Sequence, residues 1–179
     1  MFTRRQFLKG HGPTYGRRAL ESVGIRVYEN DAVRLVQNGQ PFWLAGLGDQ
    51  IAFAPNRQYG RLSWQGVDDL PGTLAQIDDD TPAILMAHEP DIFVDVPDRF
   101  ALTLSGHTHG GQVRLLGRSP VVPSRYGERF AYGYVVERRD RDAGPRSLIV
   151  SGGLGCSIMP VRVGMQPEIV VVELGSVSG

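Results

Sequence analysis

The sequence of 179 residues contains a single cysteine, Cys156, so it can form no disulfide within the chain. A scaffold held together by disulfides is therefore excluded. The flanking residues, Gly155 and Ser157, offer no base that would activate the thiol. We expect Cys156 to be a small, buried or half-buried apolar side chain and not a nucleophile.

Long apolar runs and an excess of charge of one sign are also missing. No run approaches the roughly 20 apolar residues that a membrane-spanning helix needs. Lys plus Arg and Asp plus Glu number 19 each, so the formal net charge is +0. This balance gives no electrostatic reason to expect a nucleic acid or an anionic membrane surface as a partner. The length suits one domain, and 23 Gly and 12 Pro predict many turns.

The first residues carry paired arginines. Thr3–Lys9 resembles the twin-arginine export signal of bacteria. Such a signal continues into an apolar stretch of about 7–15 residues, whereas Gly10–Arg18 is polar. We therefore separate residues 1–11, a twin-arginine-like segment, from a domain over 12–175. Export or attachment at the membrane periphery, retention in the cytoplasm, and a chance basic N-terminus all stay open.

Hydrophobic periodicity and turn signals predict two short helices and several short strands along the chain. Asn38-Gly39 predicts a tight hairpin between the apolar runs Ala32–Val36 and Phe42–Leu47. Helices are expected over residues 17–23 and 68–77. Further strands are expected over residues 25–28, 83–87, 100–105, 130–137, 147–151 and 169–174, with an exposed charged turn over 138–146. Asp78-Asp79-Asp80 is interpreted as a solvated turn in preference to a metal cluster.

The strongest chemical feature is a histidine pair in a glycine-flanked turn, Gly106-His107-Thr108-His109-Gly110-Gly111. It directly follows the apolar run Phe100–Ser105, and ligand sites of open α/β sheets lie at such carboxyl ends of strands. In extended backbone a spacing of two places both imidazoles on the same side. The glycines permit positive φ, and we expect the hydroxyl of Thr108 to hold the turn.

A third histidine, His88, ends the apolar run Ala83–Ala87. If the strands ending at His88 and before His107 are neighbours, three imidazoles converge at one sheet edge. Imidazole suits zinc, iron, nickel and, in mixed sites, manganese. A purely structural histidine turn is the alternative.

Together these motifs resemble those of calcineurin-like metallophosphoesterases, and more narrowly the bacterial twin-arginine-exported phosphodiesterase branch. The resemblance covers residues 15–174. It is carried by four stretches: Leu85–Pro90, Leu104–Gly111, Pro123–Gly127 and Ser151–Gly155.

The resemblance implies a metal-dependent phosphoester hydrolase. The expected fold is part of an α/β/β/α sandwich, with residues 12–175 forming its C-terminal portion. By position, His88 and His107 would bind one metal ion and His109 a second, the ions being Mn, Fe or Zn. The implied substrate is a phosphoester, and Arg125 and Tyr126 are candidates for substrate contact or for surface roles.

The motifs of the family's first half are missing from the sequence: an Asp-x-His pair, a bridging Gly-Asp and a Gly-Asn-His-Asp loop. Gly10-His11-Gly12 is compared with a remnant of that loop, which would place His11 where a general acid stands. Asp49, in Gly48-Asp49, lies downstream of where the bridging motif belongs. We therefore expect an N-terminally shortened chain that binds one metal ion or none.

Three interpretations stay open at this point. The chain is a hydrolase, or it is a catalytically inactive metal-binding remnant or interaction protein that associates with another chain or with itself through an incomplete sandwich. An incorrect gene model is the third.

Overall fold

The computed structural model describes residues 15–53, 56–58, 61–139, 144–157 and 160–175. The twin-arginine-like segment and His11 lie outside the described residues. The chain divides into two compact units, one formed by residues up to His88 with Arg99–Ala101, the other by Glu89–Asp98 and the residues from Leu102 onward. The two units are taken in turn.

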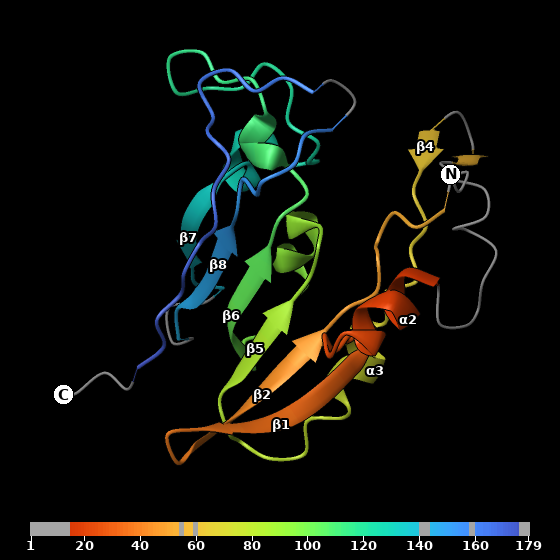
Figure 1. The fold of residues 1–179 in the computed structure, drawn as a ribbon, viewed down its shortest axis with the longest axis vertical. Coiled ribbons are helices and arrows are strands. Elements are labelled where there is room, and N and C mark those ends of the chain that lie inside the picture. Colours follow the sequence, from red (N-terminus) through yellow and green to blue (C-terminus); the bar gives the residue numbers. More distant parts are fainter. Residues whose placement is uncertain (1–14, 54–55, 59–60, 140–143, 158–159, 176–179) are drawn as a thin grey trace. The chain divides into compact units, whose positions relative to one another are not determined.

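The first unit is built on a long hairpin of β1 (Asp31–Gln37) and β2 (Gln40–Gly46), which Figure 1 shows in orange. The two residues of its turn, Asn38 and Gly39, have φ of 52° and 78°. Both angles are positive, as a tight turn matched to the strand twist requires, so the predicted hairpin is confirmed. β2 then pairs in parallel with β5 (Ala83–Met86), whose first three residues are buried, as a continuous apolar run predicts.

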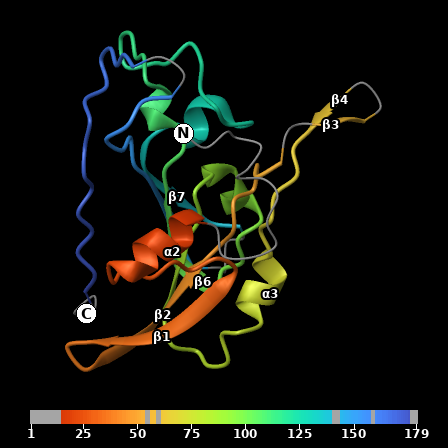
Figure 2. The ribbon, with the colours of Figure 1, turned by 45° about the vertical axis from the view of Figure 1, so that its right-hand side comes forward.

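Short helices accompany these strands. α2 (Tyr15–Ser22) ends before Gly24, which has φ of 85°. α3 (Leu70–Leu74) begins at Asp69, whose side chain accepts a hydrogen bond from the amide of Gly72 at 2.9 Å. α3 lies beside β1, and both views show this (Figure 2). Strands β3 (Asn56–Gln58) and β4 (Arg61–Ser63) form a separate two-stranded ribbon.

The strand predicted over residues 25–28 is wrong, because those residues have no strand partner. Asn30 (φ 55°) turns the chain just before β1 begins. Its side chain accepts from the amide of Gly48 and donates to the carbonyl of Val67, at 2.9 and 2.6 Å. The side chain of Asn30 thus holds the end of this segment, which has no strand pairing to hold it.

The second unit contains β6 (Phe100–Ser105) from Leu102 onward, β8 (Arg146–Val150) and β7 (Gly133–Glu137), in the order β6-β8-β7. Residues Leu102–Ser105 of β6 pair in parallel with β8, and β8 pairs antiparallel with β7. Three short 3-10 helices complete the unit: η1 (Pro90–Val94), η2 (His109–Gly111) and η3 (Gly127–Phe130).

Two fully buried rings anchor the core of this unit. Phe93 of η1 and Phe130 of η3 meet edge to face, with ring centroids 5.9 Å apart. Since Phe130 ends η3, β7 begins only at Gly133, three residues later than the sequence predicted.

Three other expectations are wrong at particular residues. Arg146, expected in an exposed turn, is 4% exposed, because its guanidinium lies 4.3 Å from the Phe93 ring centroid and donates to two backbone carbonyls. Cys156 is exposed, not buried. Residues 169–174 form no strand, and Val171 among them is 89% exposed.

The α/β class is confirmed. Each unit combines parallel and antiparallel strand pairings with short helices. Among the described residues, no helix is long and apolar enough to cross a membrane.

Candidate metal centre

The histidine turn follows the end of β6 and has a left-handed backbone. φ is 66° at His107 and 51° at His109, and it is also positive at Gly110, Gly111 and Gln112. The extended geometry that the spacing suggested is therefore wrong for this pair. An L residue in this region costs about 1–2 kcal/mol, so the surrounding structure must hold the turn in place.

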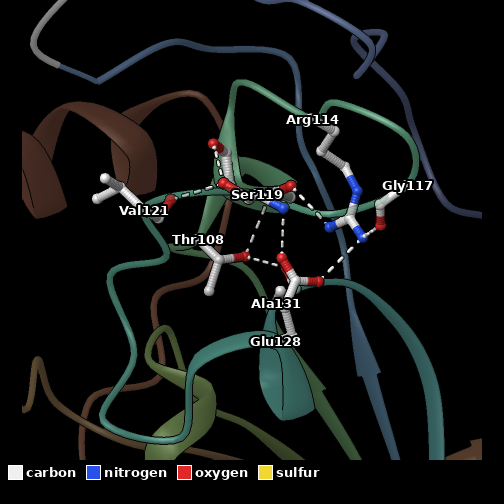
Figure 3. A network of polar contacts seen from close by, with 9 residues as sticks. Thr108, Arg114, Gly117, Ser119, Val121, Glu128 and Ala131 are labelled. Atoms are coloured by element: carbon white, nitrogen blue, oxygen red, sulfur yellow. Dashed lines mark hydrogen bonds and ion pairs between the residues drawn. The ribbon is translucent and has the colours of Figure 1, made fainter.

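Thr108 fixes the centre of the turn. Its hydroxyl, in a side chain 1% exposed, donates to the carbonyl of Ala131 at 2.6 Å (Figure 3). The same oxygen accepts from the amide of Gly110 at 3.3 Å. The expectation that the Thr108 hydroxyl holds the turn is confirmed.

The carbonyls of the two glycines are held as well. Arg114 donates from Nη1 to the Gly110 carbonyl at 3.1 Å, and the Ser119 hydroxyl donates to the Gly111 carbonyl at 2.9 Å. A Cβ at Gly110 would lie 2.7 Å from Sδ of Met165, and one at Gly111 would lie 2.3 Å from Ser119. Both positions therefore require glycine for their space and for their φ.

Three neighbouring side chains offer metal ligands. His88, Glu89 and His107 each present one ligand atom, and these atoms all lie within 4.8 Å of one another. Glu89 is 4% exposed, and its Oε1 lies 3.8 Å from Nδ1 of His107. Two imidazoles and one carboxylate suit a divalent ion such as Mn, Fe or Zn. The donor chemistry of the residues present therefore fits the metal that the resemblance implies.

The sequence analysis missed Glu89. Its side chain follows directly on His88 at the end of β5, where alternation along a strand would point the two side chains apart. The strand ends at Met86, however, and Glu89 caps the N-terminus of η1 before Pro90. The signal available was the acidic residue placed just beyond a buried strand.

His109 is not a member of this group. Its Nδ1 lies 3.0 Å from the carbonyl oxygen of Gly155 and 3.3 Å from Nη2 of Arg162. If Nδ1 carries the proton and donates it to Gly155, the lone pair of Nε2 is available to a metal ion. The assignment of His109 to a second ion stays a prediction.

Arg125 and Tyr126 are held by Asp91 and by the core. The amide of Arg125 donates to Asp91 at 2.8 Å, while its side chain is 77% exposed. The ring of Tyr126 meets that of Phe130 edge to face at 5.1 Å. Contact of either residue with substrate stays a prediction.

Asp79, in the acidic triplet, has a structural role. Its Oδ1 accepts from the indole of Trp43 and from the amide of Thr81, at 2.8 and 3.0 Å. Hydrogen bonding from Thr81 and from Trp43 lowers the pKa of this carboxyl to about 2. The interpretation of the triplet as a turn agrees with these contacts.

Several curated proteins are similar to this chain. A Bacillus subtilis (strain 168) protein named as the uncharacterized metallophosphoesterase YkuE is 31% identical over 169 residues, which cover 93% of this chain and 52% of that protein. The phosphodiesterase YaeI of Escherichia coli (strain K12) is 30% identical over 160 residues, covering 87% and 49%. An uncharacterized metallophosphoesterase of Aquifex aeolicus (strain VF5) is 28% identical over 163 residues, covering 87% and 52%.

The chain thus spans about half the length of the curated relatives it matches. No family model and no solved structure matches it. Two of these three relatives are named as metallophosphoesterases and the third as a phosphodiesterase.

Proposed function

We propose that this chain carries part of the active centre of a calcineurin-like metallophosphoesterase and, more narrowly, that the reaction is hydrolysis of a phosphodiester. The observation that carries the proposal is the group of His88, Glu89 and His107 beside a turn held in a strained backbone conformation. Strained backbone is concentrated at functional sites, where the surrounding contacts maintain it. The names of three relatives support the same chemistry.

In this proposal His88, Glu89 and His107 hold one divalent ion. The ion, when bound, polarises a phosphoryl oxygen and lowers the pKa of a water molecule to which it binds. Glu89 contributes one negative charge beside the two imidazoles. If Nδ1 of His109 carries the proton and donates it to the carbonyl of Gly155, Nε2 is left for a second ion.

A second candidate is a chain that binds metal without hydrolysing substrate. The small number of carboxylates favours it, because Glu89 is the one acidic residue in the group of His88, Glu89 and His107. One carboxylate offsets a single charge, whereas two divalent ions bring four, so the second ion would be bound weakly. Such a chain would act by association, and sedimentation equilibrium at several protein concentrations would show whether it pairs with itself.

Metal titration and hydrolysis distinguish the two candidates. We would remove bound metal by dialysis against a chelator, titrate Mn²⁺ and Zn²⁺ by calorimetry, and assay hydrolysis of bis(4-nitrophenyl) phosphate. Both candidates predict that His107→Gln and Glu89→Gln weaken metal binding at least tenfold, as loss of a direct ligand requires. The hydrolase also predicts turnover in the wild-type chain that these variants lose.

Asp49→Asn is the matched control. Asp49 stands in a Gly-Asp pair, but its carboxylate accepts a hydrogen bond from the amide of Ile51 and is not in the ligand group. This variant should bind metal like the wild type. Metal binding without turnover would leave the second candidate, and a wild-type chain that binds neither ion would overturn the hydrolase.

The twin-arginine-exported branch is also a proposal, supported by Thr3–Lys9. Fusing residues 1–24 to a reporter that is active only after export would test it, with both arginines replaced by lysine as the control. Equal export of the two fusions would contradict the proposal.

A further inference from the structure

A second carboxylate, outside the ligand group, stands at the centre of the contacts that hold the histidine turn. The Oε2 atom of Glu128 lies 3.0 Å from Nη2 of Arg114, and its Oε1 accepts from the amide of Ser119 at 2.5 Å. Figure 3 shows Glu128 below the loop that contains both partners. Glu128 belongs to η3, so one side chain links η3 to this loop.

The two partners of Glu128 are the residues that bind the glycine carbonyls of the turn. Arg114 donates to Gly110, and Ser119 donates to Gly111. Arg114 also donates to the carbonyl of Gly117. The Ser119 hydroxyl also lies within hydrogen-bond distance of the Val121 carbonyl, at 2.8 Å. Glu128 binds both residues through other atoms than those that donate to the turn, namely Nη2 of Arg114 and the backbone amide of Ser119, and so helps to hold both residues in place.

These contacts matter because the backbone conformation of the turn is strained and needs support beyond its own backbone hydrogen bonds, such as that from the Gly111 amide to the Thr108 carbonyl at 2.8 Å. His107 and His109 both have positive φ, which an isolated chain would leave for the ordinary right-handed or extended regions. Two connections oppose this change. One is the Thr108 hydroxyl on the carbonyl of Ala131, and the other runs through Arg114 and Ser119 to Glu128.

We propose that Glu128 is a positioning residue for the histidine turn, acting through Arg114 and Ser119 on the orientation of His107 and His109. The inference rests on the proposed function, because the orientation of these imidazoles matters most if they bind metal. Removing residues that orient metal ligands without binding the metal themselves typically lowers metal affinity by about 10- to 100-fold.

The charges and exposures separate this role from a general contribution to stability. The Arg114 and Glu128 side chains are 16% and 40% exposed. Because the Glu128 side of this ion pair is open to water, the pair contributes little to folding. Loss of Glu128 should therefore leave the unfolding midpoint nearly unchanged while it alters the turn.

The test compares Glu128→Ala and Glu128→Gln with the wild-type chain. Calorimetric titration of Mn²⁺ should show affinity lowered roughly tenfold in the alanine variant. The glutamine variant should lose less, because its amide oxygen can still accept from Ser119. The double variant with Arg114→Gln should lose less affinity than the two single losses combined, because the two residues share the contact between Arg114 and Glu128.

A readout without metal keeps this inference separate from the proposed function. In the metal-free chain, amide hydrogen exchange at Gly110 and Gly111 should be roughly tenfold faster in Glu128→Ala than in the wild type. Glu21→Gln is the matched control, because Glu21 forms a similarly exposed ion pair with Arg17, at 2.8 Å. That variant should change neither readout.

The outcomes are distinct. A wild-type chain without metal affinity would overturn the proposed function, and the exchange rates would still decide the role of Glu128. Exchange and metal affinity in Glu128→Ala that both stay within twofold of the wild type would overturn the positioning role.

Discussion

The hydroxyl of Thr108 and the carbonyl of Ala131, 23 residues apart in the chain, are joined by a buried hydrogen bond of 2.6 Å. This bond ties the middle of the histidine turn to the residue that follows η3. It is short and shielded from water, so its loss leaves a buried carbonyl unsatisfied.

Replacement of Thr108 by Val should therefore destabilise the chain by about 1–3 kcal/mol, because the side chain keeps its shape but loses the hydroxyl. Unfolding in urea, followed by circular dichroism, measures the change. Thr108→Ser keeps the donor and should retain most of the stability. Equal unfolding midpoints for the valine and serine variants would show that the bond contributes nothing.

Gly111 and Gly39 allow backbone strain to be separated from steric contact. Both have φ of 78°, but a Cβ at Gly39 would meet nothing within 4 Å, whereas one at Gly111 would lie 2.3 Å from Ser119. Gly39→Ala should cost about 1 kcal/mol, from the left-handed conformation alone. Gly111→Ala should cost clearly more in the same urea experiment. The prediction fails if the two alanine variants unfold at the same concentration.

Asp79 gives stability that depends on pH. Hydrogen bonds from Thr81 and Trp43 lower its pKa to about 2 in the folded chain, below the ordinary value of 3.8. A lowered folded pKa means that the stabilisation is present above the ordinary value and is lost as the pH falls toward 2. The stability difference between wild type and Asp79→Asn should shrink as the pH falls from 4 toward 2. A difference that is constant from pH 2 to 6 would contradict this assignment.

His109 and His107 should differ in their effect on metal binding. His107 lies in the ligand group and His109 does not. His107→Gln should lower the affinity for the first ion bound. His109→Gln should leave that affinity within about twofold of the wild type and should abolish binding of any second ion. Calorimetric stoichiometry and affinity measure both effects. If both variants lowered the affinity for the first ion equally, both imidazoles would be ligands of that ion.

The sequence predicted those elements that depend on local signals. The hairpin at Asn38-Gly39 and the strand Phe100–Ser105 were confirmed, because turn chemistry and a continuous apolar run each specify one structure. The strand expected over residues 169–174 was wrong, since a run of β-branched residues forms a strand only with a partner to pair with. Arg146 was misplaced because its partners, the carbonyls of Phe93 and Val96, are some fifty residues away.

The candidate site was predicted in part for the same reason. Local motifs identified His88 and His107, which the structure places in one group. The contribution of Glu89 depends on where β5 ends, and that of Glu128 depends on contacts across the loop that precedes it. No local sequence pattern predicts such contacts, because they depend on how the chain folds back on itself.

Three side chains that are not imidazoles, those of Thr108, Arg114 and Ser119, supply hydrogen bonds that close the histidine turn, and His109 adds one contact with the carbonyl of Gly155. The choice of ligand and the shape of the backbone are therefore separable properties. Asp and Asn accept a left-handed backbone more readily than most residues, whereas β-branched side chains are excluded. Carboxylate or amide oxygens at positions 107 and 109 would shift the turn toward harder cations such as magnesium, while the framework around it stays the same.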